Sequence, residues 1–228
     1  MTKSKTLKPF RVVAVDGGAA SGKSSTSRGL ATRHNLMHVD TGSHYRAVSL
    51  ACLREGLSAE DTPALREFVA KLPLGSCVDG YESRICLESS EPVDKDELRS
   101  DAVNGVVSPF SAMPFIRDAV KAYQRSQVDI ARDNGFDGIV MDGRDIGTVI
   151  LPDADLKIFM TADPDTRQRR RELEGATDTV ADRDKRDSTR KTAPLKAADD
   201  AVVIDNSNLS LQQVVDRISD LLSSLPAD

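Results

Sequence analysis

The chain has 228 residues, a formal net charge of −5, 39% hydrophobic residues and 29% charged residues. This length suits one large domain with a sizeable core, and the composition is ordinary for a globular protein. The acidic balance disfavours nonspecific binding of nucleic acid, so a phosphate site needs a local cluster of Lys and Arg.

Cysteine usage and the first residues indicate where the protein resides. The three cysteines, Cys52, Cys77 and Cys86, form no CxxC pair and favour neither a disulfide framework nor a zinc site. Residues 1–9 are basic, but no apolar segment of a signal peptide follows them, and no run of about 20 apolar residues occurs. We therefore expect a cytoplasmic protein without a membrane partner, with a loose tail over residues 1–9 and one domain over residues 10–228. The alternative for the tail is a basic arm that contacts a partner.

The first predicted element is an apolar strand over Val12–Val15, and a glycine-rich loop follows it. From Gly17 to Ser24 this loop matches the pattern G-x-x-x-x-G-K-[ST], and helix-forming sequence comes next. Glycine permits backbone conformations in which successive amide hydrogens point at phosphate oxygens. We expect Lys23 to reach the outer phosphates and the Ser24 hydroxyl to coordinate Mg²⁺. The sequence therefore predicts a nucleotide triphosphate site, and the alternative is a flexible glycine turn.

Polar residues follow the second predicted strand. After a first helix over residues 24–33, the strand over residues 36–39 ends at DTGSHYR, which leads into a helix that runs to about residue 55. Open α/β sheets bind ligands at the carboxyl ends of their strands, which makes Thr41, Tyr45 and Arg46 candidates. The alternatives are a turn residue, an edge of the core and a solvated charge. The histidines show no ligand spacing and are expected to be structural: His34, His38 and His44.

The pattern changes between residues 74 and 93. A polar helix is predicted over residues 58–71, and two short β-type runs then follow at residues 76–78 and 84–87. These runs predict a small antiparallel sheet inserted into the α/β frame. The insertion is either a cap over the substrate or a hairpin without a role in binding.

Arg117 stands near the start of a long predicted helix. A short helical stretch over residues 96–108 ends near Pro109, and the long helix covers residues 114–134. A cation in the first turn opposes the helix dipole, so this position favours a ligand contact by Arg117.

The next strand, over residues 138–141, ends at Asp142-Gly143-Arg144-Asp145. Enzymes with a phosphate loop place a carboxylate near Mg²⁺ at such a strand end, which makes Asp142 a candidate. We expect Arg144 to bind a phosphate and Asp145 to contact a base or a sugar. The alternative for these two residues is an ion pair on the surface.

Two arginine-rich segments lie further along the chain. The first is a helix over residues 164–174, which follows a strand over residues 156–160, and the second covers residues 183–190. Residues 175–180 between them are expected to be flexible. Guanidinium groups bind phosphate oxygens through paired hydrogen bonds and keep their charge, so the sequence predicts a hinged arginine lid over a triphosphate. The alternatives are a solvated helix with ion pairs and a nucleic-acid patch, which the lack of interleaved aromatic residues disfavours.

The last predicted elements are a strand over residues 201–204 and an amphipathic helix over residues 210–222, with Ser210 as its N-cap. Five strands thus alternate with helices, and no internal repeat is visible. This order predicts an α/β fold with a parallel, doubly wound sheet.

Five sequence blocks resemble those of the bacterial cytidylate kinases, which are P-loop nucleoside monophosphate kinases that transfer phosphate from ATP to CMP or dCMP. The blocks are VDGGAASGKSS, DTGSHYR, VVSPFSAMPFIRDAV, DGRDIGTVILPDADLKIF and RDKRDSTRKTAPL. They stand in the order and spacing of the family and cover the chain from Val12 to about Val215. The chain departs from the family at Gly18, where proline is usual, and between Leu173 and Asp182, where the segment is shorter than the usual lid.

The resemblance implies a role for each matched residue. ATP phosphates would bind along the loop at Gly17, Gly18, Ala19, Ala20, Ser21, Gly22, Lys23, Ser24 and Ser25. Cytosine contacts are implied for Thr41, Arg117, Asp145 and Arg190, sugar contacts for Ser108, Arg183 and Asp187, and surroundings of the CMP phosphate for Tyr45, Arg46 and Arg144. The implied catalytic residues are Lys23, Arg144 and the lid arginine Arg170, with ATP as donor and Mg²⁺ near Ser24 and Asp142. We expect an acceptor-binding region over residues 40–110 that includes the inserted sheet near residues 74–93, a lid over residues 167–192, and a monomer.

In-line phosphoryl transfer requires mainly positioning and neutralisation of charge. We expect Lys23 and the lid arginines to neutralise the transferred group, while Arg46 and Arg144 hold an acceptor phosphate that is already an anion and needs no general base. Two other functions share the loop. One is a kinase for UMP or for an acceptor that is not a nucleotide, and the other is a nucleotide-dependent switch that binds ATP without phosphorylating an acceptor.

Overall fold

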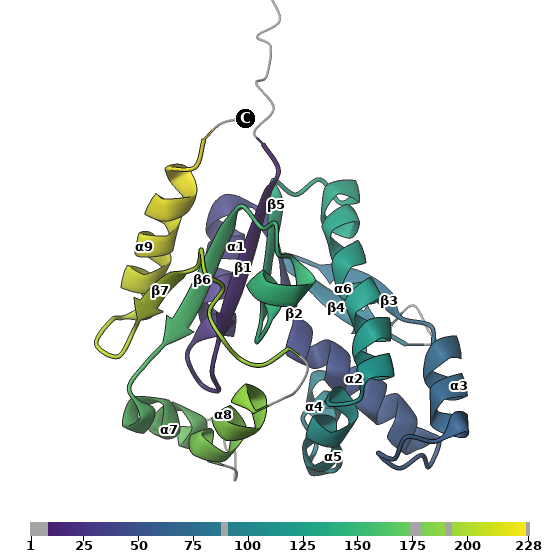
Figure 1. The fold of residues 1–228 in the computed structure, drawn as a ribbon. Helices are drawn as coiled ribbons and strands as arrows, with labels where there is room; N and C mark the ends of the chain where they lie inside the picture. The colour runs from purple at the N-terminus through teal and green to yellow at the C-terminus, as the bar shows by residue number, and fades with distance from the viewer. Residues whose placement is uncertain (1–8, 88–90, 174–178, 190–192, 227–228) are drawn as a thin grey trace, which may run out of the picture.

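The computed structural model describes residues 9–87, 91–173, 179–189 and 193–226. A sheet of seven strands in the order β3-β4-β2-β5-β1-β6-β7 forms its centre, and helices cover both faces (Figure 1). The strands are β1 Arg11–Gly17, β2 Leu36–Asp40, β3 Gly75–Asp79, β4 Glu82–Cys86, β5 Gly138–Gly143, β6 Leu156–Thr161 and β7 Val202–Asp205. The helices are α1 Lys23–His34, α2 Thr41–Arg54, α3 Pro63–Lys71, α4 Lys95–Leu98, α5 Asp101–Ser111, α6 Pro114–Asp133, the π-helix η1 Ile146–Ile150, α7 Pro164–Leu173, α8 Val180–Ser188 and α9 Leu211–Ser223.

Strand β1 shows why the sheet is buried on both faces. Successive side chains of a strand point to opposite faces, and an apolar run therefore needs cover on each side. Val13 and Val15 pack with α1 and α9 on one face. Ala14 packs on the other face with Ile146 of η1 and Ala131 of α6. The apolar run that predicted this strand therefore marks the centre of the core.

The observed sheet contains the five predicted parallel strands and, in addition, a hairpin. Strands β2, β5, β1, β6 and β7 are mutually parallel, as the alternation of strands and helices predicts. Strands β3 and β4 form the expected antiparallel hairpin, and β4 pairs in parallel with β2 at His38 and Glu82, so the hairpin continues the sheet beyond β2. The hairpin is thus part of the main sheet, which has seven strands instead of five.

The helices differ from the prediction in three places. Helix α3 begins at Pro63, not at residue 58, because the Thr62 side chain accepts the amide hydrogen of Leu65 and caps the helix there. The stretch predicted over residues 96–108 is two helices, α4 and α5. Helix α5 continues through Pro109 to Ser111, and because Pro109 lies in the last turn, the missing amide hydrogen weakens only that turn. No helix is predicted in the second arginine-rich segment, but α8 covers most of it and begins at Val180, the last residue of the stretch predicted to be flexible.

The layout places two groups of helices at one end of the sheet. Helices α7 and α8 lie at the carboxyl ends of the parallel strands, at the same end as α2, α4 and α5 (Figure 1). The chain enters β1 and leaves α9 at the opposite end.

All three cysteines have free thiols. Within the described ranges, every helix is too short or too polar to cross a bilayer. Residues 1–8 of the predicted N-terminal tail and residues 175–178 of the predicted flexible segment lie outside these ranges.

Candidate active site

The glycine-rich loop connects β1 to α1, as the sequence predicts. A side chain at Gly17 would place its Cβ 2.3 Å from the carbonyl oxygen of Met160, so only glycine fits beside β6. Gly22 adopts a left-handed conformation with φ 85° and immediately precedes α1. The Ser21 hydroxyl donates to the carbonyl oxygen of Gly18 at 3.0 Å and closes the loop on itself. The amide hydrogens at the start of α1 are therefore presented at the end of the loop, where a phosphate binds in such structures.

Lys23 folds back over this loop. Its Nζ atom donates to the carbonyl oxygen of Gly18 at 2.7 Å and to Ser21 Oγ at 3.3 Å, and the residue is 7% exposed. Burial and the nearby Arg144 cation lower the pKa of Lys23 to about 7, although the Asp142 and Asp16 carboxylates oppose the shift. An anion bound at this position would restore the ammonium form, so the lysine is arranged to bind a phosphate oxygen.

Ser24 and Asp142 meet beside the loop. The Ser24 hydroxyl donates to Asp142 Oδ1 at 3.0 Å, and Thr41 Oγ1 donates to the Asp142 carbonyl oxygen at 2.7 Å. The second carboxylate oxygen of Asp142 lies 2.7 Å from His38 Nε2, and both residues are buried. Burial by itself would raise the pKa of Asp142, but the His38 hydrogen bond and the charge of Lys23 outweigh it and lower this pKa.

This pair fits Mg²⁺. The ion prefers hard oxygen ligands and keeps several waters, and it is commonly bound by one or two protein oxygens together with substrate phosphates. Among the described residues, no group of three His, Cys, Asp or Glu side chains is arranged as a complete metal site. A hydroxyl and a carboxylate beside a phosphate loop are therefore the protein's contribution to such a site.

Arg117 of α6 forms a buried ion pair with Asp145, which follows β5. Arg117 Nη2 lies 2.5 Å from Asp145 Oδ2, and each side chain is 7% exposed. Arg117 Nη1 donates to the carbonyl oxygen of Ser111 at 3.3 Å, and the guanidinium carbon lies 5.4 Å from the centre of the Tyr45 ring. Ser108 lies in the same turn of α5 as Ser111, and its carbonyl oxygen accepts a hydrogen bond from Ser111 Oγ at 3.1 Å. The structure thus brings Tyr45, Ser108, Arg117 and Asp145 to one region.

Several guanidinium groups gather around Arg46. Arg46 Nη1 donates to Asn104 Oδ1 at 2.7 Å and to the carbonyl oxygen of Leu98 at 3.1 Å. Burial lowers the pKa of Arg46 to about 10, and the nearby cations of Arg183, Arg99 and Arg171 add to the shift. Mutual repulsion of this kind is relieved by a bound anion, so the cluster is suited to a phosphate.

Helices α7 and α8, which lie in the segment predicted to form a lid, contact residues of the β5 end and of the glycine-rich loop. Arg144 Nε donates to Asp187 Oδ2 of α8 at 2.7 Å. Arg170 of α7 donates through Nη1 to Asn206 Oδ1 at 2.9 Å, and Asn206 Nδ2 donates to the carbonyl oxygen of Ser21 at 2.7 Å. Arg170 therefore lies next to the glycine-rich loop. Arg190 lies outside the described residues.

The sequence analysis did not assign three residues that lie in the site. His38 contacts Asp142, and Asn206 contacts the glycine-rich loop. Asp16 accepts the amide hydrogens of Ile146 at 2.8 Å and of Gly147 at 2.7 Å. Burial raises the pKa of Asp16 to about 6 despite these two hydrogen bonds. A polar residue inside an apolar strand was the available signal for His38 and for Asp16, since burial of such a group requires a partner.

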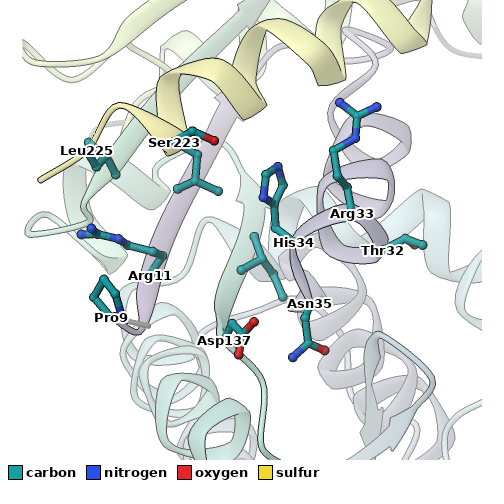
Figure 2. Close-up of a pocket in the computed structure, with 11 residues that line it drawn as sticks. Pro9, Arg11, Thr32, Arg33, His34, Asn35, Asp137, Ser223 and Leu225 are labelled. Carbon is teal, nitrogen blue, oxygen red and sulfur yellow. The ribbon is translucent and has the colours of Figure 1, made fainter. Parts of the chain in front are cut away.

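A separate groove of about 490 Å³ lies at the amino ends of the strands (Figure 2). Arg11, Asp137 and Leu225 are among its lining residues. Two of its basic side chains already have partners, because Arg33 pairs with Asp216 at 2.5 Å and His34 lies 2.8 Å from Ser219 Oγ. Arg33 and His34 are thus engaged within the protein, whereas Lys23 and several arginines gather at the carboxyl-end site.

Comparisons with known proteins show which family the chain resembles. A family model described as cytidylate kinase matches residues 13–224. A cytidylate kinase of Streptomyces avermitilis is 40% identical over 221 residues, which cover 94% of this chain and 93% of that protein. The cytidylate kinase of Nocardia farcinica is 43% identical over 219 residues and 91% of each chain, and that of Exiguobacterium sibiricum is 39% identical over 92% of this chain and 95% of its own length.

Proposed function

The chain belongs to the cytidylate kinase family, and we propose that it transfers the γ-phosphate of ATP to CMP and dCMP, forming ADP with CDP or dCDP. The observation that carries this proposal is the pairing of β1 with β5, which aligns Val15 with Asp142 and Asp16 with Gly143. Parallel neighbours end at the same edge of the sheet, so the phosphate loop and the Asp142–Asp145 segment emerge side by side. A donor phosphate and an acceptor would meet there.

The donor phosphates bind along Gly17–Ser25 in this proposal. Backbone amide hydrogens and the start of α1 hold the phosphate oxygens, and Lys23 moves from the loop carbonyl to the outer phosphates. Arg170, which already lies beside the loop through Asn206, adds positive charge from the lid. Together these groups neutralise the charge that spreads over the transferred group.

Ser24 and Asp142 would hold Mg²⁺, directly or through water. When bound, the ion would supply positive charge that neutralises the charge developing on the transferred phosphoryl group. The role of the protein is to hold the two oxygens 3.0 Å apart beside the loop, with His38 and Thr41 fixing the orientation of Asp142.

The acceptor phosphate would lie between Arg46 and Arg144, with Arg183, Arg99 and Arg171 close to Arg46. Two guanidinium groups hold a phosphate in a defined orientation, which favours in-line attack on the donor. The attacking oxygen is already anionic, so no general base is required.

Arg117 and Asp145 would recognise cytosine, with Thr41 and Arg190 nearby. A carboxylate accepts from the amino group of cytosine, and a guanidinium donates to the ring acceptors. UMP presents an acceptor where cytosine has its amino group, and that oxygen would face Asp145 without a proton between them. Ser108, Arg183 and Asp187 would contact the sugar.

The lid and the acceptor region complete the proposal. Residues 167–192 would close over the donor and exclude water, which otherwise competes as phosphoryl acceptor. Residues 40–110 would form the acceptor side, including the hairpin β3–β4. We expect a cytoplasmic monomer.

A coupled assay of ADP formation tests the proposal with CMP, dCMP, UMP and AMP as acceptors, each with ATP and Mg²⁺. We expect rapid turnover with CMP and dCMP, slow turnover with UMP and AMP, and slight ATP hydrolysis without an acceptor. Equal use of UMP would indicate the wider kinase, and ATP binding without any turnover would indicate a nucleotide-dependent switch.

A further inference from the structure

A carboxylate of the lid occupies a hydrogen-bonding position on the phosphate loop. The backbone amide of Ala19 donates to Asp184 Oδ1 of α8 at 3.1 Å. Arg167 Nη1 of α7 pairs with Asp184 Oδ2 and donates to the carbonyl oxygen of Ala19 at 3.4 Å. The Arg167 and Asp184 side chains are 13% and 25% exposed, so the pair is partly shielded from water.

The packing at Gly18 shows how closely the lid approaches the loop. A Cβ atom at Gly18 would lie 2.6 Å from Arg167 Nη1 and 2.9 Å from Asp184 Oδ1. With a larger residue at this position, the ends of the Arg167 and Asp184 side chains would have to shift, so the pair lies directly against the loop. A carboxylate held by a loop amide and a guanidinium is chemically similar to a phosphate held by the same two donors.

A second carboxylate on the same face of α8, that of Asp187, contacts a residue proposed to bind the acceptor. Asp184 and Asp187 are three residues apart on α8 and lie on one face of the helix. Asp187 pairs with Arg144 at 2.7 Å, a residue that the proposed function assigns to the acceptor phosphate. Helix α8 thus presents one acidic group to the donor loop and another to the acceptor arginine.

We propose that Asp184 competes internally with the donor for the phosphate loop, and that Arg167 is a donor-binding residue which Asp184 holds in place. On binding, an oxygen of the donor phosphate replaces the Asp184 carboxylate on the Ala19 amide and on Arg167. The negative charge of Asp184 therefore weakens donor binding, while Arg167 strengthens it. This inference rests on the proposed function in one respect, namely that the loop binds ATP.

Asp184→Asn tests the competition, because the amide keeps the size of the side chain and still accepts from Ala19 but has no charge. Isothermal titration with ATP and Mg²⁺ should show roughly tenfold tighter binding, the size of a lost charge-assisted hydrogen bond. Arg167→Gln should weaken ATP binding by roughly tenfold for the same reason. Asp165→Asn is the matched control, since Asp165 is an exposed residue in the first turn of α7, and it should leave ATP affinity unchanged.

Urea unfolding shows whether the Asp184 contact stabilises the free protein, and the ATP affinity of the same variant separates competition from a structural latch. Without nucleotide, Asp184→Asn should unfold at a lower urea concentration, because the free protein loses the ion pair with Arg167. A latch alone predicts that ATP affinity also falls or stays the same, and either result would overturn the inference. If the unmodified chain itself fails to bind ATP, the proposed function fails instead, so the two failures are distinguishable.

Discussion

The Arg117 guanidinium lies 2.5 Å from the Asp145 carboxylate, and each side chain is only 7% exposed. The two residues come from α6 and from the segment after β5, so the pair joins the acceptor side to the end of the sheet. A buried pair of this kind is costly to break, because the remaining charge has no partner. Its effects on stability and on substrate use must therefore be measured separately.

Single and double replacements of this pair separate the two effects. Arg117→Met or Asp145→Leu alone should lower the free energy of unfolding by about 3–5 kcal/mol, because each leaves one buried charge unpaired. The double variant should recover most of this loss in urea unfolding. It should still use CMP roughly ten- to a hundredfold less efficiently, with the KM for ATP unchanged. Recovery of CMP use together with stability would show that the pair is structural only.

Ser24 and Asp142 should determine the requirement for Mg²⁺. Because the Ser24 hydroxyl lies 3.0 Å from Asp142 Oδ1 beside the loop, loss of either oxygen removes a ligand or its orienting partner. Ser24→Ala and Asp142→Asn should each need roughly ten- to a hundredfold more Mg²⁺ for half-maximal rate. Binding of Mn²⁺ in the presence of ADP, followed by electron paramagnetic resonance, should weaken in parallel. Thr32→Ala, at an exposed position near the other end of α1, serves as the control. An unchanged metal requirement in both variants would remove these residues from the metal site.

His38 should act on the metal only through Asp142. The imidazole lies 2.7 Å from Asp142 Oδ2 and is 2% exposed. His38→Leu should raise the Mg²⁺ requirement by roughly tenfold while leaving the KM for CMP unchanged. His34→Leu, at the end of α1, removes a histidine that contacts Ser219 instead, and its metal requirement should match that of the parent chain. Equal metal requirements in the two variants would contradict an orienting role for His38.

His44 should make the fold sensitive to acid. Its ring is fully buried and packs 4.8 Å from the Tyr123 ring, and within the described part of the chain neither ring nitrogen has a hydrogen-bond partner. Burial lowers the pKa of His44 from 6.5 to about 3, so between these values the unfolded chain binds more protons than the folded one. Stability from the neutral ring is therefore complete above pH 6.5 and declines as the pH falls, by up to about 1.4 kcal/mol per pH unit.

Replacement of this ring tests the argument. His44→Leu should raise the free energy of unfolding by about 1–3 kcal/mol at pH 7.5, because two unsatisfied buried groups are removed. The advantage over the parent chain should grow in urea unfolding at pH 5. A constant difference between the two proteins across this range would mean that His44 does not titrate as described.

Local patterns predicted most of the fold and only part of the site. Apolar runs located the parallel strands, and the glycine pattern located the phosphate loop, because both are properties of consecutive residues. The contact between His38 and Asp142 depends instead on the register of β2 against β5, which joins residues 104 positions apart. The contact of Asp184 with Ala19 spans 165 positions and depends on where the lid packs. The π-helix η1 has no local sequence signature, because its first two amide hydrogens are accepted by the carboxylate of Asp16, which lies in strand β1.

Transfer of label from ATP labelled in its γ-phosphate tests the central claim most directly. Incubation with CMP and Mg²⁺ should yield labelled CDP in an amount equal to the ADP formed, and Lys23→Met should abolish the transfer while remaining folded. Release of the label as inorganic phosphate, or a folded protein that leaves CMP unlabelled, would contradict the account.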